Sequence, residues 1–216
     1  RVKSSEEIFN LFVMLKTGDN PKNNLDYYLK ELSSNELMSN QMIYADKKYG
    51  HVPKFYDFNH KVKSNRGLTA LYYALVREIR PKSILETGTA WGSMTSFMLC
   101  ALAKNKKGKL TSIDLPPDKG ELNMNVTINK DNVGLYIPDD YKGRHKVIFG
   151  DAKQILPIYL VSEKVDFFVH DSLHSHLHMA FEYRCAINLM SKDGIILSDD
   201  ILYWNTAFHS FCKEHS

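Results

Sequence analysis

A pair of glycines behind an acidic residue is the feature of this chain that points most directly to chemistry. Glu86, Gly88 and Gly92 follow the apolar run Ile84-Leu85 and precede a stretch with helical periodicity. A turn between a buried strand and a helix lies where open α/β sheets bind ligands, and its glycines let backbone and ligand approach closely. The spacing G-x-x-x-G departs from the G-x-G-x-x-G of dinucleotide-binding turns, which disfavours an NAD-linked oxidoreductase. The pattern indicates a cofactor turn of another kind.

A carboxylate at the end of the next strand would face the same ligand. The apolar stretch that begins at Leu110 ends at Asp114. The carboxyl ends of parallel strands meet at one edge of a sheet, and a carboxylate there can accept hydrogen bonds from both hydroxyls of a ribose. Asp114 is therefore the predicted ribose ligand. The alternative is that Glu86 and Asp114 only cap helices or end strands.

Three more acids close two later strands. Asp171 follows an apolar strand that ends in His170, and Asp199 and Asp200 follow a second one that ends in Ser198. These carboxylates should gather at the same sheet edge, and hard oxygen ligands at this density suit Mg²⁺. A metal there would hold the hydroxyls of a substrate and lower their pKa. The alternative is that the acids cap the helices that follow them.

The glycine turn and the strand ends together resemble the class I S-adenosylmethionine-dependent methyltransferases, whose first motif has the form E-x-G-x-x-x-G. By this resemblance, the turn passes against the methionine part of the cofactor, while Ser93 and Thr95 hydrogen-bond its carboxylate at a helix start. Asp151, after the third strand, matches the acid that accepts a hydrogen bond from the adenine amino group. The implied cofactor residues are Glu86, Gly88, Thr89, Gly92, Ser93, Asp114, Asp151 and Asp171.

The later acids resemble those of a metal-dependent O-methyltransferase group that includes the macrocin, novobiocin-sugar and cephalosporin hydroxylase-like proteins and, more distantly, the catechol type. The resemblance implies that Asp171, Asp199 and Asp200 bind Mg²⁺ and that His174, with Asp171, is catalytic, its imidazole taking the acceptor proton. The stretch from Asp171 resembles the group's D-G-x-H-x-Y signature, with Ser172 in place of Gly and a His in place of Tyr.

Other roles for the histidines remain open. His174 could be a structural histidine bonded to a loop carbonyl. His174 and His178 could also share one helix face at i, i+4 spacing and bind a transition metal, although no cysteine lies near them and no H-E-x-x-H pattern is present.

The elements that must position these residues alternate along the chain. Short apolar runs separated by helical patterns predict an α/β fold, a Rossmann-like doubly wound parallel sheet with an N-terminal helical extension, and the resemblance covers about residues 67–204. The expected strands are 83–86, 110–114, 146–149, 165–169 and 194–197, and the expected helices include 67–79, 94–103 and 181–190.

The N-terminal part should be helical from Ser4 to about Gly50, with a second run near Leu25 to Leu32, and residues 44–65 should form an irregular loop or lid. We divide the chain into this extension and lid, 1–64, and a methyltransferase domain, 65–216. Residues 116–144 are expected to form a long connection with one weak helix. No strand is expected after Ile201, whereas the family's sheet ends in an antiparallel pair, so the domain could be trimmed or completed by a partner.

Composition excludes several classes of protein. The 28 Lys and Arg against 25 Asp and Glu leave a net charge of +3, too small to predict nucleic acid or an anionic membrane as partner. The three cysteines form no CxxC pair, and no signal core or membrane-spanning run is present, which favours a cytoplasmic protein with reduced thiols. A homo-oligomer is compatible with this sequence.

The sequence therefore predicts a methyltransferase that uses S-adenosylmethionine and Mg²⁺ to O-methylate a small molecule such as a sugar or polyol-like natural product. Two alternatives remain: a metal-independent N- or O-methyltransferase that uses His174 alone, and a noncatalytic module that binds the cofactor.

Overall fold

The computed structural model describes residues 25–49, 66–115, 121–123, 126–128, 130–159, 164–201 and 206–215. The helix predicted from Ser4 and residues 50–65 of the predicted lid lie outside the described residues. No helix in the described ranges is both long and apolar enough to cross a membrane.

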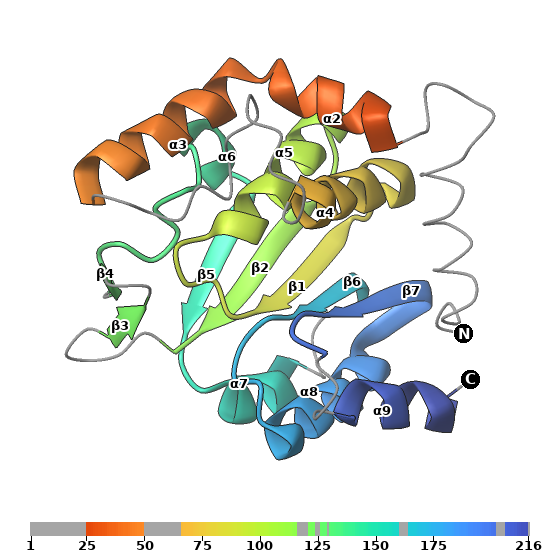
Figure 1. Ribbon diagram of the computed structural model, residues 1–216. Coiled ribbons are helices and arrows are strands. Elements are labelled where there is room, and N and C mark those ends of the chain that lie inside the picture. The colour runs from red at the N-terminus through yellow and green to blue at the C-terminus, as the bar shows by residue number, and fades with distance from the viewer. Residues whose placement is uncertain are drawn as a thin grey trace.

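Five parallel strands form the central sheet (Figure 1), in the order β5-β2-β1-β6-β7. All pairs are parallel, as the β1 partners Thr87 with Ile113 on β2 and Thr87 with His170 on β6 illustrate. This arrangement confirms the predicted Rossmann-like sheet. The strands are β1 (Ser83–Thr87), β2 (Lys109–Asp114), β5 (His145–Phe149), β6 (Val165–His170) and β7 (Met190–Ser198).

Helices cover both faces of the sheet (Figure 1), which confirms the doubly wound prediction. One layer, here the upper layer, contains α2 (Leu25–Ser33), α3 (Glu36–Tyr49), α4 (Arg66–Ile79), α5 (Ser93–Asn105) and the short α6 (Asp139–Lys142). The lower layer contains α7 (Ala152–Tyr159), α8 (His176–Leu189) and α9 (Ala207–His215).

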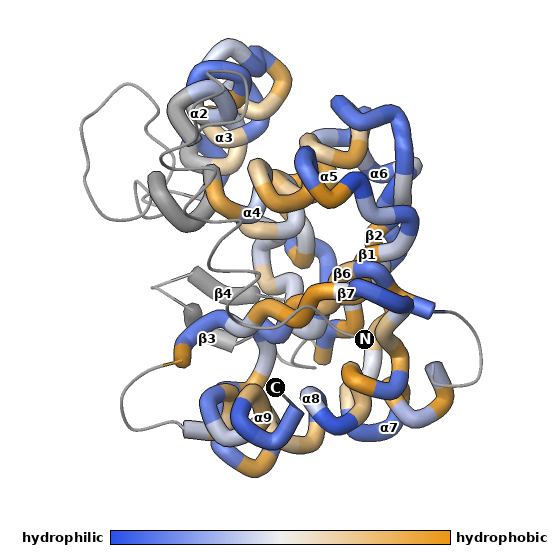
Figure 2. Tube along the Cα trace, turned by 90° about the vertical axis from the view of Figure 1, so that its right-hand side faces the viewer, coloured by the Kyte–Doolittle hydropathy of each residue, from blue (hydrophilic) through white to orange (hydrophobic). Residues whose placement is uncertain are grey.

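Consecutive residues on a strand point alternately to the two faces of the sheet and pack against the two helix layers. On β6, Phe167 belongs to the core under the upper layer and Phe168 to the core under the lower layer, and both side chains are fully buried. Ile195 and Ile196 divide in the same way on β7. Burial of one such side chain contributes about 1.5–3 kcal/mol. Figure 2 shows the resulting hydrophobic colour along the central strands.

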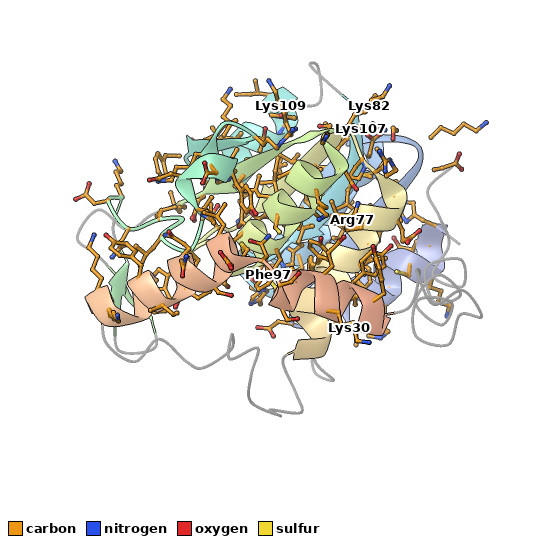
Figure 3. All side chains as sticks on the ribbon, turned by 90° about the horizontal axis from the view of Figure 1, so that it is seen from above. Lys30, Arg77, Lys82, Phe97, Lys107 and Lys109 are labelled. Atoms are coloured by element: carbon orange, nitrogen blue, oxygen red, sulfur yellow. The ribbon has the colours of Figure 1, made fainter. Side chains whose placement is uncertain are left out.

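The N-terminal helices pack on the upper layer. Leu32 of α2 and Met38 of α3 are fully buried in the same core as Phe97 of α5. Arg77 of α4 donates from Nε to Glu31 of α2 over 2.9 Å. Figure 3 shows Phe97 and Arg77 next to these helices in the view from above. The helical extension is therefore part of the packed structure.

The helical pattern predicted to about Gly50 is confirmed over α3, and the irregular segment predicted from residue 44 is wrong for its first part, because α3 continues to Tyr49. Met38, Met42 and Ala45 lie at helical spacing and are buried, and this stripe outweighs the polar composition around it. Lys47 and Lys48 in the last turn also suit the negative end of the helix.

Four other elements differ from the sequence prediction. The helix α7 was not predicted, and α8 begins at His176 rather than near residue 181. The expected long connection contains the predicted weak helix, α6, but also an antiparallel pair, β3 (Glu121–Asn123) and β4 (Val126–Ile128). Within the ranges that the structure describes, no strand follows β7, as expected.

Candidate functional site

The turn after β1 adopts a backbone that glycine makes possible. Gly88 and Gly92 have φ of 85° and 76°, and Ala90 between them has φ of 46°. A Cβ atom on Gly88 would lie 1.9 Å from the backbone oxygen of Asp171. Glycine at this position is therefore required for the turn after β1 to lie directly against the turn after β6.

Gly92 is needed for packing of the turn itself. A Cβ atom there would lie 2.9 Å from the Cα of Gly134, in the segment that follows β4. The Gly134 amide donates to the Ala90 carbonyl over 2.9 Å, and the Tyr136 amide donates to the Trp91 carbonyl over 2.9 Å. The predicted connection, residues 116–144, thus packs against the turn after β1 and forms hydrogen bonds with its backbone.

Asp114, the predicted ribose ligand, lies against this turn. Its Oδ2 accepts hydrogen bonds from the amides of Thr89 (3.2 Å) and Ala90 (3.0 Å). Burial raises the pKa of the carboxyl, and the hydrogen bonds from these amides oppose the rise. Asp114 therefore both stabilises the turn and lies beside the space that the turn encloses.

Glu86 is buried below the turn and is 1% exposed. It accepts hydrogen bonds from Thr95 Oγ1 (2.8 Å) and Ser112 Oγ (2.6 Å). Burial raises its pKa to about 7. The hydrogen bonds from the two hydroxyls lower this pKa, and the neighbouring charge of Asp114 raises it. The Thr95 hydroxyl, expected at the cofactor carboxylate, is directed at Glu86 instead.

The turns after β6 and β7 bring the predicted acids together. The Asp171 amide donates to the Thr87 carbonyl and the Asp199 amide to the His170 carbonyl, each over 2.9 Å. The side chains of Asp171 and Asp199 form a hydrogen bond. Burial, followed by the charge of Asp199, raises the pKa of Asp171 well above its usual value.

Asp200 faces His174 rather than the other two acids. Its Oδ2 lies 3.2 Å from His174 Nδ1, while His174 Nε2 lies 3.7 Å from Asp171 Oδ1. The described ranges contain no cluster of three or more His, Cys, Asp or Glu side chains around a common metal position. The adjoining carboxylates of Asp171 and Asp199 nevertheless offer the oxygen donors that a hard dication prefers.

Glu182 on α8 is the centre of a buried network that the sequence did not reveal. Oε2 accepts from Thr87 Oγ1 (2.5 Å) and lies 2.6 Å from His170 Nδ1. Oε1 accepts from Ser172 Oγ (2.8 Å) and lies 2.7 Å from His178 Nε2. The serine that replaces the glycine of the signature is thus bound to a buried carboxylate.

The partners of Glu182 determine its charge. Burial alone would raise the pKa, but hydrogen bonds from His170 and His178 and the charge of His170 lower it to about 2. A carboxylate that stays ionised can only accept hydrogen bonds, so the ring nitrogens that face it must carry hydrogen.

The alternative of a transition-metal site formed by His174 and His178 on one helix face is wrong. His178 lies on α8, but His174 precedes this helix.

A cavity of about 610 Å³ lies at the carboxyl ends of the strands. Of the predicted site residues, it is lined by Gly88, Asp114, Asp151, Asp171 and His174. The other predicted residues do not line it: Glu86 lies on β1, and the adjoining turns and helix start contain Thr89, Gly92, Ser93, Asp199 and Asp200. Asp151 Oδ1 also accepts from the Lys153 amide over 2.8 Å at the start of α7.

Two leucines and a histidine of this cavity were missed. Leu115 and Leu173 are 66% and 59% exposed, which is unusual for leucine, and both line the cavity. His178 lines it as well. Leu115 directly follows the predicted ribose ligand, and Leu173 lies between Asp171 and His174. Their closeness in sequence to predicted site residues could have identified them as cavity residues.

A second cavity, of about 520 Å³, lies at the opposite, amino ends of the strands. Its lining includes Lys82 and Lys107, which Figure 3 shows near Lys109. Asp166 in this cavity accepts from the Lys82 amide over 2.6 Å and from Ser191 Oγ over 2.7 Å. These contacts join strand ends and give this cavity a structural explanation.

Comparisons with known proteins agree with this geometry. The profile of the methyltransferase domain family matches residues 85–201, more than half of the 216 residues. None of the curated proteins matches the chain by sequence.

Solved structures of similar fold include O-methyltransferases. One from Bacillus cereus, in complex with SAH, is 14% identical, with a TM-score of 0.54 over 84% of this chain and 78% of that one. The O-methyltransferase TomG from Streptomyces achromogenes, in complex with SAM, is 15% identical, with a TM-score of 0.53 over 84% and 77%. A cofactor-bound protein from MTB is 14% identical, with a TM-score of 0.52 over 99% and 84%.

These structures share the fold, whereas the profile match covers the turn after β1, the strand-end acids and the turns after β6 and β7. The chain therefore belongs to the methyltransferase domain family and is a class I S-adenosylmethionine-dependent methyltransferase.

Proposed function

We propose that this chain transfers the methyl group of S-adenosylmethionine to a hydroxyl oxygen of a small molecule. The observation that carries the proposal is the composition of the cavity at the carboxyl ends of the strands. Gly88 and Asp114 line one part of it, and Asp171 and His174 line another. A cofactor site and a proton-accepting site therefore share one cavity.

The nucleoside end of the cofactor is assigned to the part of the cavity near Asp114. The carboxylate accepts hydrogen bonds from the ribose hydroxyls, as it accepts them from the turn amides in this structure. The exposed Leu115 and Leu173 supply apolar surface for the adenine ring, since both line the same cavity. Asp151 remains the predicted partner of the adenine amino group.

His174 is the proposed general base. Burial lowers the pKa of its ring, while Asp200 opposes the shift, so the imidazole is neutral at neutral pH and can accept a proton from a hydroxyl. Asp200 at 3.2 Å from Nδ1 orients the ring and stabilises the imidazolium that forms. Positioning of the hydroxyl oxygen in line with the sulfonium carbon then supplies most of the rate increase.

Magnesium is the proposed metal, bound by Asp171 and Asp199, whereas Asp200, predicted as the third ligand, is assigned to His174 instead. The carboxylates of Asp171 and Asp199 adjoin one another, and the charge of Asp199 helps to raise the pKa of Asp171, so a dication would satisfy this pair. When bound, the ion lowers the pKa of a hydroxyl that it contacts. The acceptor proposed from the resemblance is a sugar or polyol-like natural product, and the similar TomG is itself described as involved in tomaymycin synthesis.

Calorimetry and a transfer assay test this proposal. S-Adenosylhomocysteine should bind and NAD should not, and a panel of sugar and polyol acceptors should yield a methylated product detectable by mass spectrometry. His174→Ala should lower kcat by about 10²- to 10⁴-fold, the usual contribution of a general base, with little effect on binding of the cofactor product. His176→Ala, an exposed histidine at the start of α8, is the matched control.

Failure of S-adenosylhomocysteine to bind at millimolar concentration would remove the proposal. An unchanged kcat in the His174→Ala enzyme would contradict the assignment of His174 as the general base. The metal-independent alternative is favoured by one observation, that the described part of the chain lacks a three-residue metal cluster. Activity that survives both EDTA and Asp199→Ala would establish this alternative over the Mg²⁺ enzyme.

A further inference from the structure

A buried histidine in the wall of the cavity at the carboxyl ends of the strands has one ring nitrogen without a hydrogen-bond partner within the described ranges. His178 lines the cavity and is 6% exposed. Its Nε2 lies 2.7 Å from Glu182 Oε1, one helical turn further along α8. Its Nδ1 is buried and has no hydrogen-bond partner within the described ranges. Buried polar atoms are nearly always paired, so a lone ring nitrogen in a cavity wall indicates a bound partner.

Glu182 decides which chemistry His178 presents. The carboxylate already accepts from Thr87 and Ser172 hydroxyls and from the His170 ring, and it has no hydrogen to donate. The Nε2 that faces it must therefore carry the ring hydrogen. In the neutral ring this leaves a lone pair on Nδ1, which makes His178 a hydrogen-bond acceptor at the cavity wall.

The position of His178 places it near the nucleobase end of the cavity. The lower layer packs α8 against α7, and Met179, next to His178, shares a buried core with Ala152 of α7. Ala152 and the adjoining Asp151 and Lys153 line the same cavity. His174, at the acid end, lies before the helix begins. The hydrogen-bond donor of an adenine ring bound at this end of the cavity is its exocyclic amino group.

We propose that His178 Nδ1 accepts a hydrogen bond from the exocyclic amino group of the adenine ring, and that Glu182 is the positioning residue that fixes the acceptor form of this ring. The proposal rests on the proposed function, because it needs an S-adenosyl ligand in the cavity. It makes the Glu182 network part of cofactor selection and not only part of the fold.

The test compares two ligands by calorimetry: S-adenosylhomocysteine and its deamino analogue, in which hydrogen replaces the amino group of the purine. The measured quantity is the ratio of their dissociation constants. His178→Gln is the informative variant, because its amide nitrogen can reach Glu182 in place of Nε2 while the Nδ1 acceptor is removed. We expect the preference for the amino ligand to fall about three- to tenfold, as for loss of one neutral hydrogen bond.

Three further variants separate binding from folding. His178→Asn places an amide oxygen near the position of Nδ1 and should retain the preference while it loses the Glu182 contact. Glu182→Gln can donate to Nε2, which moves the ring hydrogen to Nδ1, and should lower the preference without touching the ligand. His176→Gln, exposed on the same helix, should leave the preference unchanged.

An unchanged preference in a folded His178→Gln protein that binds S-adenosylhomocysteine would overturn the proposal. If His178→Gln does not fold, nitrogen NMR of the wild-type ring decides: Nδ1 should shift on addition of S-adenosylhomocysteine and not with the deamino analogue, and equal shifts overturn the proposal. A wild-type protein that binds neither ligand contradicts the proposed function itself, an outcome distinct from either of these.

Discussion

The upper and lower layers each bury one glutamate against the carboxyl end of the sheet, and the two have opposite acidity. Glu86, under α5, accepts hydrogen bonds from the hydroxyls of Thr95 and Ser112, and burial raises its pKa to about 7. Glu182, on α8, is equally buried, but its histidine partners outweigh burial and lower its pKa to about 2. At equal burial, the charge of the partners decides the protonation state.

The two glutamates consequently stabilise the protein in different pH ranges. The pKa of Glu182 is below its unfolded value of 4.5, so its contribution is present above pH 4.5 and is lost as the pH falls towards about 2. The pKa of Glu86 is above its unfolded value of 4.5, so its contribution is present below pH 4.5 and is lost as the pH rises to about 7. The lower layer holds a fixed charge, and the upper layer holds a group that titrates near neutrality.

Glu182→Ala should produce the largest loss of stability. The change leaves two hydroxyls and two imidazole N–H groups buried without their acceptor, and breaking such a network costs about 3–5 kcal/mol of the free energy of unfolding. Urea unfolding at neutral pH measures this loss. Glu86→Ala should cost less, because the Thr95 and Ser112 hydroxyls can rotate towards other acceptors. Equal losses for the two variants would contradict the comparison.

Short-range pattern in the sequence was sufficient for much of the fold and for part of the site. The runs that end at Thr87, Asp114 and His170 are strands, and the turn after Asp171 does meet the glycine turn after β1. In these cases apolar runs and strand-end residues carry the information locally. The helical stripe of Met38, Met42 and Ala45 lies within the helical pattern predicted to about Gly50, although the polar residues from Tyr44 onwards also favoured a loop.

The Glu182 network could not be found from sequence spacing alone. Its partners His170 and Thr87 lie 12 and 95 residues away and come from two strands that pair only in the folded sheet. A glutamate in a helix is ordinarily exposed. Met179 and Ala186 lie at helical spacing from Glu182 and are buried, but this stripe does not show which partners the carboxylate meets. The pairing with His178 at i, i+4 was visible, but the spacing alone does not indicate whether such a pair is buried.

Glu86→Gln should change the pH dependence of stability more than its magnitude at low pH. Because the folded protein holds the Glu86 proton up to about pH 7, the wild type should lose about 3 kcal/mol of its free energy of unfolding between pH 4.5 and 7, at about 1.4 kcal/mol for each pH unit. Glutamine does not titrate, so the variant should have a flatter curve and should gain on the wild type as the pH rises to 8. Urea titrations from pH 4.5 to 8 measure the two slopes.

Glu214→Gln, on the exposed side of α9, controls for the loss of one carboxyl group and should leave the slope of the wild type unchanged. Parallel curves for the wild type and Glu86→Gln would show that Glu86 is ionised across this range. The upper-layer glutamate would then behave like Glu182, and the contrast between the layers would disappear.

Thr95→Val should give the smallest effect and should sharpen the contrast further. The Thr95 hydroxyl donates to Glu86 and lowers its pKa, so removing it should raise that pKa further, by an amount equivalent to about one hydrogen bond. The destabilisation by Thr95→Val should therefore grow as the pH rises through the neutral range. Ser96→Ala, which removes a hydroxyl bonded within α5, should be independent of pH. If the cost of Thr95→Val stays constant over this range, or stays pH-dependent when Glu86→Gln is added, its hydroxyl does not act through the charge of Glu86.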